Sequence, residues 1–447
     1  MPPRPAPFPP LRAPPFPWAK AAATRVARHG ETSSPFDAAR ADAVLSRIEA
    51  EGLIGAWWQD ENEAGAVMRA QLAALGPDER LRLVHREFIA SVRYTDPFDG
   101  TGMDVERMLD LASLWRRQLT ANRAIGRVEG MRAWKRRAMD RFLWDGGPPR
   151  PRAGARAVWP SRVAPRAGDI QIEDGFLRSR GLGVELAAPS SITLDRSGVH
   201  YDPSRPSDLE ILLATAEIDD DLKRRAARLR QRIVAAGLTK YGARGSAITL
   251  PDDRPTILVP GQVEDDRSVR LGGGDIRTSA QLLAAVRAAR PDAHVVFKPH
   301  PDVEAGLRTG TITAGAHDAD QIAANADIVD LLAQVDEVHT LTSLAGFEAL
   351  MRGVAVTTYG VPFYAGWGLT TDRGAVPSRR GRLLDLDELV AVALILYPRY
   401  MDPVTELPCP PEILVARLAA DGPSTPSVVA MLRRGQGRAH RMLQRFR

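Results

Sequence analysis

Hydrophobic and polar positions follow two different rhythms along this chain. Between residues 36 and 145, apolar residues recur three or four positions apart, which is typical of amphipathic helices. This spacing predicts helices over residues 38–51, 64–75, 78–91, 104–119 and 131–144. No strand pattern competes with them there. From residue 256 onward, short apolar runs alternate with helical runs, which predicts parallel strands covered by helices.

The clearest unit of the second kind begins at Thr256. An apolar run at 256–259, a helical run at 279–290 and an apolar run at 295–297 predict a βαβ unit. Its parallel strands must deliver both following loops to the same edge of the sheet, which is where open α/β sheets bind ligands. Further elements are expected in the same pattern: a strand at 337–340, a helix over 344–352 and a strand at 354–358.

A smaller α/β pattern precedes this unit. Residues 170–172 form a short apolar run, and the runs 191–194 and 199–201 flank a turn sequence at 195–198, which predicts a β-hairpin. Two amphipathic helices follow, over residues 208–216 and 220–235. Two α/β lobes in succession predict a ligand site in the cleft between them.

These patterns divide the chain into five segments. They are a disordered Pro-rich arm (1–35), a helical segment with a linker (36–145), a first α/β lobe (146–255), a second, Rossmann-like lobe (256–385), and C-terminal helices with a basic tail (386–447). An internal repeat links two of the segments, because Arg93–Pro97 reads RYTDP and Arg399–Pro403 reads RYMDP. We interpret the helical segment as the tail of a preceding module of the same kind.

Composition narrows the class of protein. The 447 residues are 44% hydrophobic and 26% charged, with a net charge of +5, which fits a globular chain of two or three domains and gives no reason to expect nucleic acid as a partner. Cys409 is the only cysteine, so a reducing compartment is expected. No stretch predicts a signal peptide or a membrane span. We expect a cytoplasmic protein whose basic tail (427–447) is either disordered or in peripheral contact with a membrane surface.

The two loops of the βαβ unit carry candidate chemistry. The first loop brings four polar residues past the end of its strand: Gln262, Glu264, Asp265 and Asp266. The second brings Lys298 and His300, and each of these precedes a proline, which holds it in an extended conformation. A cation and an imidazole fixed at a strand end suit a phosphate group. The alternative is an ordinary surface turn.

Carboxylates also follow the first strand of the smaller lobe, at Glu173 and Asp174. Paired carboxylates across a cleft fit glycosyl transfer, in which one is a nucleophile or stabilises an ion pair and the other handles the proton; otherwise they are turn or capping acids. Thr342 and Ser343 at a predicted helix start either bind a phosphate or simply cap the helix. Glu348, further along that helix, either reaches a ribose diol or faces solvent.

Two further features bear on which ligand the chain binds. Aromatic residues and glycines fill residues 359–368, and such a loop either stacks on a sugar or base or forms a buried aromatic turn. The eight histidines are scattered, and the D-x-D patterns at 318–320 and 385–387 follow no strand. We therefore expect no metal ion and no cofactor.

Together these motifs resemble a known family. In chain order they are EDGFLRSRGLG, SITLDRSGVHYDPSRPSDLE, LVPGQVEDDRSVRLG, FKPHPDVEAG, DEVHTLTSLAGFEALMRG and YGVPFYAGWGLTTDR. They resemble the bacterial capsule polysaccharide proteins of the KpsC type, densely over residues 130–447. The resemblance implies a GT-B-like α/β fold with two Rossmann-like lobes and a cleft between them. It also implies a retaining β-Kdo glycosyltransferase that uses CMP-Kdo as its donor.

The resemblance implies roles for individual residues. Asp266 takes the place of the covalent nucleophile, and Glu173 and Asp174 take the place of acid, base or acceptor-positioning groups. His300 is expected on the CMP phosphate, where it stabilises or protonates the leaving group. The substrate-binding residues implied are Gln262 beside the nucleophile, Lys298, Pro301, Thr342 and Ser343 around the phosphate, and Glu348 on the ribose.

Two departures from the family limit this expectation. The family carries two complete modules, whereas only the tail of a first module is recognised here, and the family's K-Y-N is Lys240-Tyr241-Gly242. The expected reaction is therefore that of the second module, β-(2→7) transfer to a Kdo-terminated glycolipid at the inner membrane, within capsule biosynthesis and export. The alternatives are a GT-B transferase for another CMP-sugar such as a sialic acid, or a non-catalytic capsule assembly or export partner.

Overall fold

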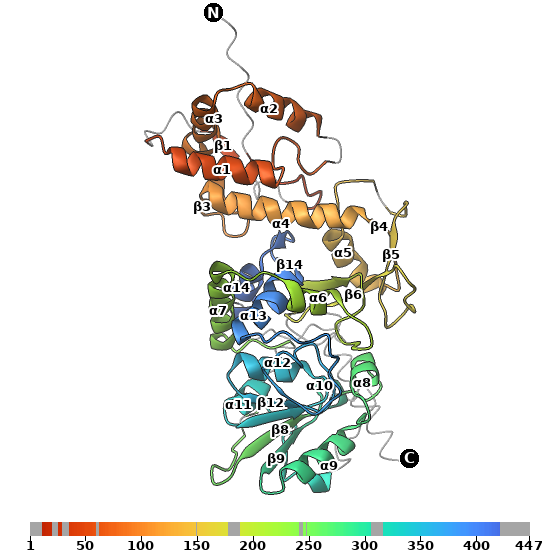
Figure 1. Cartoon of the computed structure of the whole chain (residues 1–447). Coiled ribbons are helices and arrows are strands. Elements are labelled where there is room, and N and C mark those ends of the chain that lie inside the picture. Colours follow the sequence, from red (N-terminus) through yellow and green to blue (C-terminus); the bar gives the residue numbers. More distant parts are fainter. Residues whose placement is uncertain are drawn as a thin grey trace, which may run out of the picture. The chain divides into compact units, whose positions relative to one another are not determined.

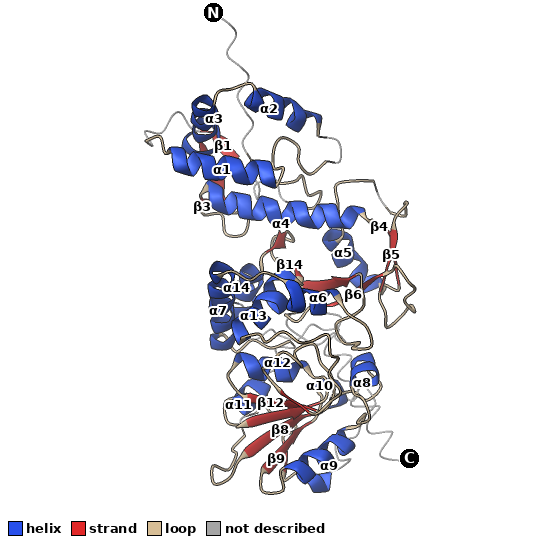
Figure 2. Ribbon diagram, viewed as in Figure 1, coloured by secondary structure: helices blue, strands red, loops and turns tan. Residues whose placement is uncertain are grey.

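The chain divides into two compact units (Figure 1). The N-terminal unit consists of Met1–Val128, Arg136–Arg156 and Tyr400–Leu414, and the α/β unit consists of Glu129–Lys135, Ala157–Arg399 and Val415–Arg447. The computed structural model describes residues 11–19, 26–28, 35–59, 62–148, 150–177, 188–240, 245–246, 248–304 and 316–420. Helices dominate the N-terminal unit, whereas the α/β unit combines strands and helices (Figure 2).

The helices predicted between residues 36 and 145 are present, with bounds close to those expected. They are α1 (Ala38–Ala50), α2 (Glu63–Ala73), α3 (Pro77–Val84), α4 (Val105–Arg123) and α5 (Ala133–Phe142). Asp37, Asn62 and Asp104 begin α1, α2 and α4 by accepting a backbone N–H from the first turn. The spacing of apolar residues therefore identified real buried faces.

The same segment contains strands that the sequence did not predict. β2 (Val92–Thr95) and β3 (Gly102–Met103) pair antiparallel, and β4 (Ile125–Glu129) lies further along. β2 also pairs antiparallel with β1 (Val26–Arg28), which lies in the preceding arm. In β2, two buried residues alternate with an exposed arginine. This alternation covers too few residues to stand out beside helical spacing. The expectation of a segment without strands was wrong.

The described part of the Pro-rich arm is ordered, contrary to expectation. Leu11 and Phe16 are buried, and the ring of Phe16 lies 5.6 Å from the ring of Trp115. The indole N–H of Trp18 donates a hydrogen bond to the carbonyl of Glu406 over 2.7 Å. The prolines keep this segment extended, and the apolar residues between them attach it to the N-terminal unit.

The internal repeat extends over several elements. The first copy runs α3, π-helix His85–Ala90, β2, β3 and α4; the second runs α13 (Leu386–Val390), π-helix Ala391–Leu396, β14 (Arg399–Met401), β15 (Pro408–Cys409) and α14 (Pro411–Ala420). Asp96 and Asp402 turn the two copies in the same way, since the carboxylate of each accepts the backbone N–H two residues later. This shared order supports the interpretation of a duplicated unit.

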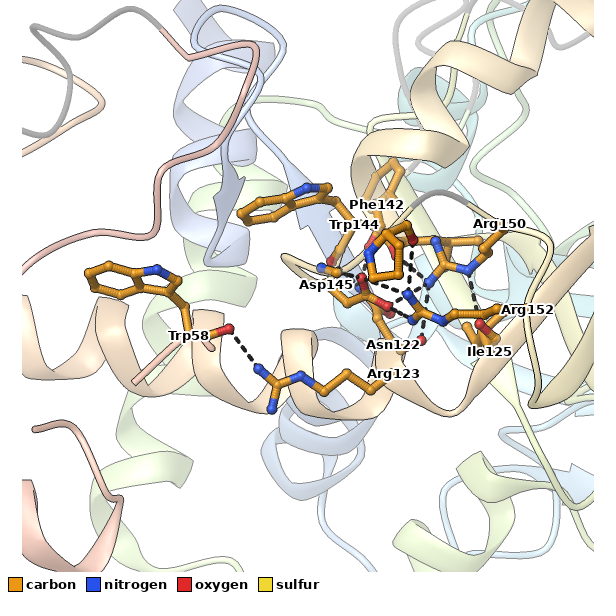
Figure 3. Close-up of polar contacts among 12 residues, drawn as sticks. Trp58, Asn122, Arg123, Ile125, Phe142, Trp144, Asp145, Arg150 and Arg152 are labelled. Carbon is orange, nitrogen blue, oxygen red and sulfur yellow. Dashed lines mark hydrogen bonds and ion pairs between the residues drawn. The ribbon is translucent and has the colours of Figure 1, made fainter. Parts of the chain in front are cut away.

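A polar cluster joins the ends of α4 and α5 in the N-terminal unit (Figure 3). Asp145 is buried and pairs with both Arg150 and Arg152. The side-chain amide of Asn122 donates to the carbonyl of Phe142 over 2.9 Å. Carbonyls in the last turn of a helix have no partner within the helix, so this cluster supplies the partners they need.

The second lobe of the α/β unit is a parallel, doubly wound sheet. Its order is β10-β9-β8-β11-β12-β13, and every neighbouring pair is parallel. The strands are β8 (Thr256–Pro260), β9 (His294–Lys298), β10 (Gln321–Ile322), β11 (Glu337–Thr340), β12 (Ala355–Thr358) and β13 (Thr371–Asp372). α9 (Ser279–Ala289) covers one face, and α11 (Ile328–Leu332) and α12 (Leu344–Met351) cover the other (Figures 1 and 2). The predicted βαβ unit is confirmed.

The first lobe contains β5 (Ala155–Val158), β6 (Ile170–Asp174) and β7 (Ser191–Asp195), with α6 (Asp208–Thr215) and α7 (Asp220–Ala235). β6 is parallel to β5 and antiparallel to β7. The hairpin predicted between 191–194 and 199–201 was wrong, because β7 pairs with β6 instead. The carboxylate of Asp195 accepts the N–H groups of Gly198 and Asp208, which turns the chain towards α6.

Candidate functional site

The candidate site lies where the strand order of the second lobe reverses. The chain continues from β8 to β9 on one side, whereas β11 lies on the other side of β8, and a crevice at such a point is where doubly wound sheets bind ligands. Gln262 follows β8 and Thr342 follows β11. The amide of Gln262 donates to Thr342 Oγ1 over 2.9 Å and accepts the Thr342 N–H over 2.9 Å. These residues therefore meet across the switch point.

Asp266 is the N-cap of α8 (Arg267–Gly272), in the loop that follows β8. Its carboxylate is exposed and accepts the Ser268 N–H over 3.3 Å. Glu264 in the same loop accepts the N–H of Ser279 over 3.1 Å and so caps α9. Of these two carboxylates, Asp266 is the one presented to solvent at the strand end.

The loop after β9 meets the loop after β8, as the parallel strands require. The N–H of Gly261 donates to the carbonyl of Lys298 over 2.7 Å. Lys298 is buried, and its Nζ lies 3.7 Å from Glu304 Oε2. His300 accepts the Asp302 N–H at Nδ1 over 3.1 Å, so a neutral ring carries its proton on Nε2. Pro301 is the first residue of α10 (Pro301–Glu304), a position that suits proline.

At the start of α12, the Ser343 side chain caps the helix. Ser343 is the N-cap and accepts the Ala345 N–H over 3.2 Å. Glu348 does not face solvent, because it is only 6% exposed and accepts the backbone N–H of Lys240 over 2.8 Å. Burial raises the pKa of Glu348. In this structure the Glu348 side chain therefore anchors the segment at Lys240.

Glu173 and Asp174 occupy different environments, because successive side chains of a strand point to opposite faces. Asp174 pairs with the buried Lys135 over 2.9 Å. Glu173 accepts the Tyr201 hydroxyl over 2.8 Å. Burial raises the pKa of Glu173 to about 7, the Tyr201 hydrogen bond opposes the rise, and the charge of Asp174 adds to it. A carboxyl group balanced near neutral pH is suited to general acid–base catalysis.

The aromatic loop after β12 is a buried turn and not a sugar-stacking surface. Tyr364 and Trp367 are 0% exposed, and Phe363 stacks on Phe176 with ring centroids 4.5 Å apart. Arg380 is buried and donates to the carbonyls of Pro362 and Ala365. The loop thus joins the second lobe to the residues that follow Glu173 and Asp174. Its aromatic rings are buried in this core and are not available to stack on a sugar.

The structure adds three residues that sequence reasoning missed: Lys135, Tyr201 and Arg267. Lys135 contacts Asp174 and lies over the Trp159 ring at 3.6 Å. Tyr201 lies within a quoted motif, but nothing in its spacing signals a contact with Glu173. Arg267 directly follows Asp266. Residues 178–187, 241–244 and 421–447, which include parts of two motifs and the basic tail, lie outside the described residues.

The described part of the chain lacks two further features. No group of three or more His, Cys, Asp or Glu side chains in it is arranged to hold a metal ion. None of its helices is both long and apolar enough to cross a bilayer.

Two α/β lobes, with a doubly wound parallel sheet and polar residues at its carboxyl edge, define the GT-B-like class of fold. The family model described as "Capsule polysaccharide biosynthesis protein" matches residues 164–241 and 220–400. These matches span more than half of the chain. The chain belongs to this family of capsule polysaccharide biosynthesis proteins.

Curated relatives share about half of this chain. The capsule polysaccharide modification protein LipA of Neisseria meningitidis serogroup A is 46% identical over 239 residues, 53% of this chain and 34% of LipA. The lipopolysaccharide-processing protein LpsZ of Rhizobium meliloti is 44% identical over 238 residues, 52% of this chain and 54% of LpsZ. The chain thus spans about a third to about half the length of these relatives.

Solved structures of Thermosulfurimonas dismutans KpsC are similar to this chain. Its β Kdo 2,7 transferase is 33% identical with a TM-score of 0.55, and the match covers 65% of this chain and 97% of that one. Its β Kdo 2,4 transferase is 37% identical with a TM-score of 0.53, over 57% of this chain and 80% of that one. By their names, these structural neighbours are Kdo transferases.

Proposed function

We propose that the chain is a retaining β-Kdo transferase that moves Kdo from CMP-Kdo to a Kdo-terminated glycolipid, through a β-(2→7) linkage. The observation that carries this proposal is the likeness to the T. dismutans KpsC β Kdo 2,7 transferase, of which 97% is matched. The β Kdo 2,4 transferase is matched over 80% of its length. The 2,4 transferase is the more identical of the two, at 37% against 33%, so the proposed 2,7 linkage rests on coverage alone.

We propose that configuration is retained by two displacements at the same carbon, each of which inverts it. In the first, the Asp266 carboxylate attacks C2 of the Kdo residue, the C2–O bond to CMP breaks, and CMP leaves with the bonding electrons. His300, with its proton on Nε2, stabilises or protonates the departing phosphate. Because Asp266 is exposed at the strand end, the carboxylate is accessible to a donor bound in the crevice.

In the second displacement, a hydroxyl of the acceptor Kdo attacks C2 and the bond to Asp266 breaks. Glu173 accepts the proton of that hydroxyl, which leaves Asp266 ionised for the next turnover. Glu173 suits this role better than Asp174, because the pKa of Glu173 is raised to about 7 by burial, whereas Asp174 is held by Lys135. Asp174 then positions the acceptor side of the site.

Gln262, Thr342 and Ser343 are proposed to receive the CMP phosphate at the switch point, with Lys298 behind them. In the structure the Thr342 N–H is bonded to Gln262, so phosphate binding at this N–H requires the Gln262 amide to turn aside. Glu348 reaches the ribose only if the segment at Lys240 releases its carboxylate. Donor binding is therefore proposed to rearrange both contacts.

A transfer assay tests this function. The purified protein is mixed with CMP-Kdo generated in situ and a synthetic Kdo-terminated acceptor, and CMP release and the product linkage are measured. We expect CMP to be released only when acceptor is present, and we expect the product to carry a β-(2→7) linkage. CMP-sialic acid should inhibit transfer no more strongly than CMP does. Transfer of sialic acid would assign another donor, and no turnover with either donor would favour a non-catalytic partner in capsule assembly.

A further inference from the structure

Tyr201 lies between the two lobes of the α/β unit. It follows β7 in the first lobe, and its hydroxyl donates to Glu173 Oε1 over 2.8 Å. Its backbone touches the second lobe, because a Cβ added at Gly272, at the end of α8, would lie 3.3 Å from the Tyr201 carbonyl oxygen. The residue that holds Glu173 therefore packs against the short helix that Asp266 begins.

Arg267 approaches the same hydroxyl from the second lobe. It is the first residue of α8, and its side chain acts on the Tyr201 hydroxyl in the direction that lowers the pKa of that hydroxyl. The Arg267 Nε atom is buried and has no hydrogen-bond partner among the described residues. The guanidinium therefore lies close enough to influence the hydroxyl, and it directly follows the carboxylate proposed as nucleophile.

We propose that Tyr201 is a positioning residue for the transfer reaction: its hydroxyl orients the Glu173 carboxyl and connects it, through Arg267, to the turn that carries Asp266. This inference rests on the proposed function and adds a residue to it. Tyr201 does not itself move a proton, because burial, and then the charge of Glu173, raise the pKa of its hydroxyl. It remains a donor throughout the pH range of the assay.

The contact has a consequence for the charge of Glu173. A hydrogen bond donated to a carboxylate favours its ionised form, so loss of the Tyr201 hydroxyl raises the pKa of Glu173. The other charged groups that act electrostatically on Glu173 are Asp174, Lys135 and Lys240, with Arg267 near the Tyr201 hydroxyl. None of these is altered by a Tyr201→Phe substitution, which also keeps the aromatic ring.

The test compares Tyr201→Phe with Tyr94→Phe. Tyr94 is a matched control, because it is a buried tyrosine in the N-terminal unit whose hydroxyl donates to the Phe88 carbonyl over 3.1 Å. For Tyr201→Phe we expect kcat to fall about tenfold or more with little change in the donor KM, and the ascending limb of kcat against pH to move up by about one unit. Tyr94→Phe should leave both unchanged.

A second measurement does not depend on turnover. The Glu173 carboxyl is titrated by ¹³C NMR, with Glu173→Gln to assign its signal, in the wild type and in Tyr201→Phe. A higher pKa in the variant supports the inference, and an unchanged pKa with an unchanged pH profile overturns it. Equal losses in Tyr94→Phe would mean a merely structural effect and would also overturn it.

Failure of the proposed function gives a different result. If the wild type transfers no Kdo while the titration still shifts in Tyr201→Phe, the hydrogen bond is as described but the reaction is not Kdo transfer. A further variant, Arg267→Met, checks the link from the other lobe. Arg267→Met should lower kcat, whereas the control variant Tyr94→Phe should keep the kcat of the wild type. A normal kcat in Arg267→Met would show that Arg267 does not help to position Glu173.

Discussion

Removal of the Lys135 ammonium tests how the acceptor-side carboxylates are held. Lys135 is 7% exposed, its Nζ lies 2.9 Å from Asp174 Oδ1, and it sits 3.6 Å above the centre of the Trp159 ring. The substitution Lys135→Met keeps the length and the apolar contacts of the side chain. It removes the ammonium group that pairs with the Asp174 carboxylate, whose side chain is only 21% exposed.

The magnitude follows from these contacts. Breaking a buried ion pair by removing one partner costs about 3–5 kcal/mol, but the Asp174 side chain is 21% exposed, so water solvates part of the charge and the lower end applies. The lost cation–π contact adds about 1 kcal/mol. We expect Lys135→Met to lower the free energy of unfolding by about 4 kcal/mol.

A double-mutant cycle isolates the pair. Asp174→Asn alone should also destabilise, whereas Lys135→Met with Asp174→Asn should cost about 1–2 kcal/mol less than the sum of the two single changes. Urea unfolding is followed by the fluorescence of Trp134 and Trp159, which lie beside Lys135. Additive single effects, or a stable Lys135→Met variant, would refute this account of Asp174.

Three other predictions concern the described contacts. Asp145→Asn should lower the free energy of unfolding of the N-terminal unit by about 2–4 kcal/mol, because it leaves two arginines near each other without their carboxylate; limited proteolysis against an exposed Asp275→Asn control would measure the loss. Since burial raises the pKa of Glu173 to about 7 and the base must be ionised, kcat/KM should rise with pH through about 7, and this limb should vanish in Glu173→Gln. Phe363→Ala should lower the free energy of unfolding by about 3–5 kcal/mol, as measured by denaturant unfolding, because it leaves a buried cavity. A stable variant with selectively weakened sugar binding would instead indicate that Phe363 stacks on a sugar.

Local patterns predicted much of the second lobe. The helix α9 and the helix α12 have apolar faces, side-chain caps at Thr278 and Ser343, and, for α12, a following Gly353 with a φ of +79°. These signals lie within a few residues of the elements they define. Their bounds could therefore be read from the sequence.

Contacts between distant residues could not be predicted in this way. Glu173 and Tyr201 are 28 positions apart, and Gln262 and Thr342 are 80 apart. Parallel strand order placed the second pair at one edge, but no periodicity reports that Tyr201 turns towards Glu173. The sequence did not predict the pairing of β7 with β6 for the same reason. A local turn signal after β7 was interpreted as the turn of a hairpin.

The aromatic loop shows a related limit. A run rich in tyrosine, phenylalanine, tryptophan and glycine suits both a sugar platform and a core turn. Phe176 from the first lobe decides between them, because it stacks on Phe363. Burial of this kind depends on which surfaces pack against each other. It therefore cannot be predicted from the sequence of the loop alone.

Asp266 is the proposed nucleophile of a Kdo transferase, and the proposed mechanism depends on this assignment. Intact-protein mass spectrometry after mixing with CMP-Kdo generated in situ tests this directly, with Asp266→Ala and the exposed Asp275→Ala as a matched pair. We expect an added Kdo mass in the wild type and in Asp275→Ala, and none in Asp266→Ala. An adduct that persists in Asp266→Ala would place the nucleophile elsewhere, and no adduct and no CMP release in the wild type would contradict Kdo transfer itself.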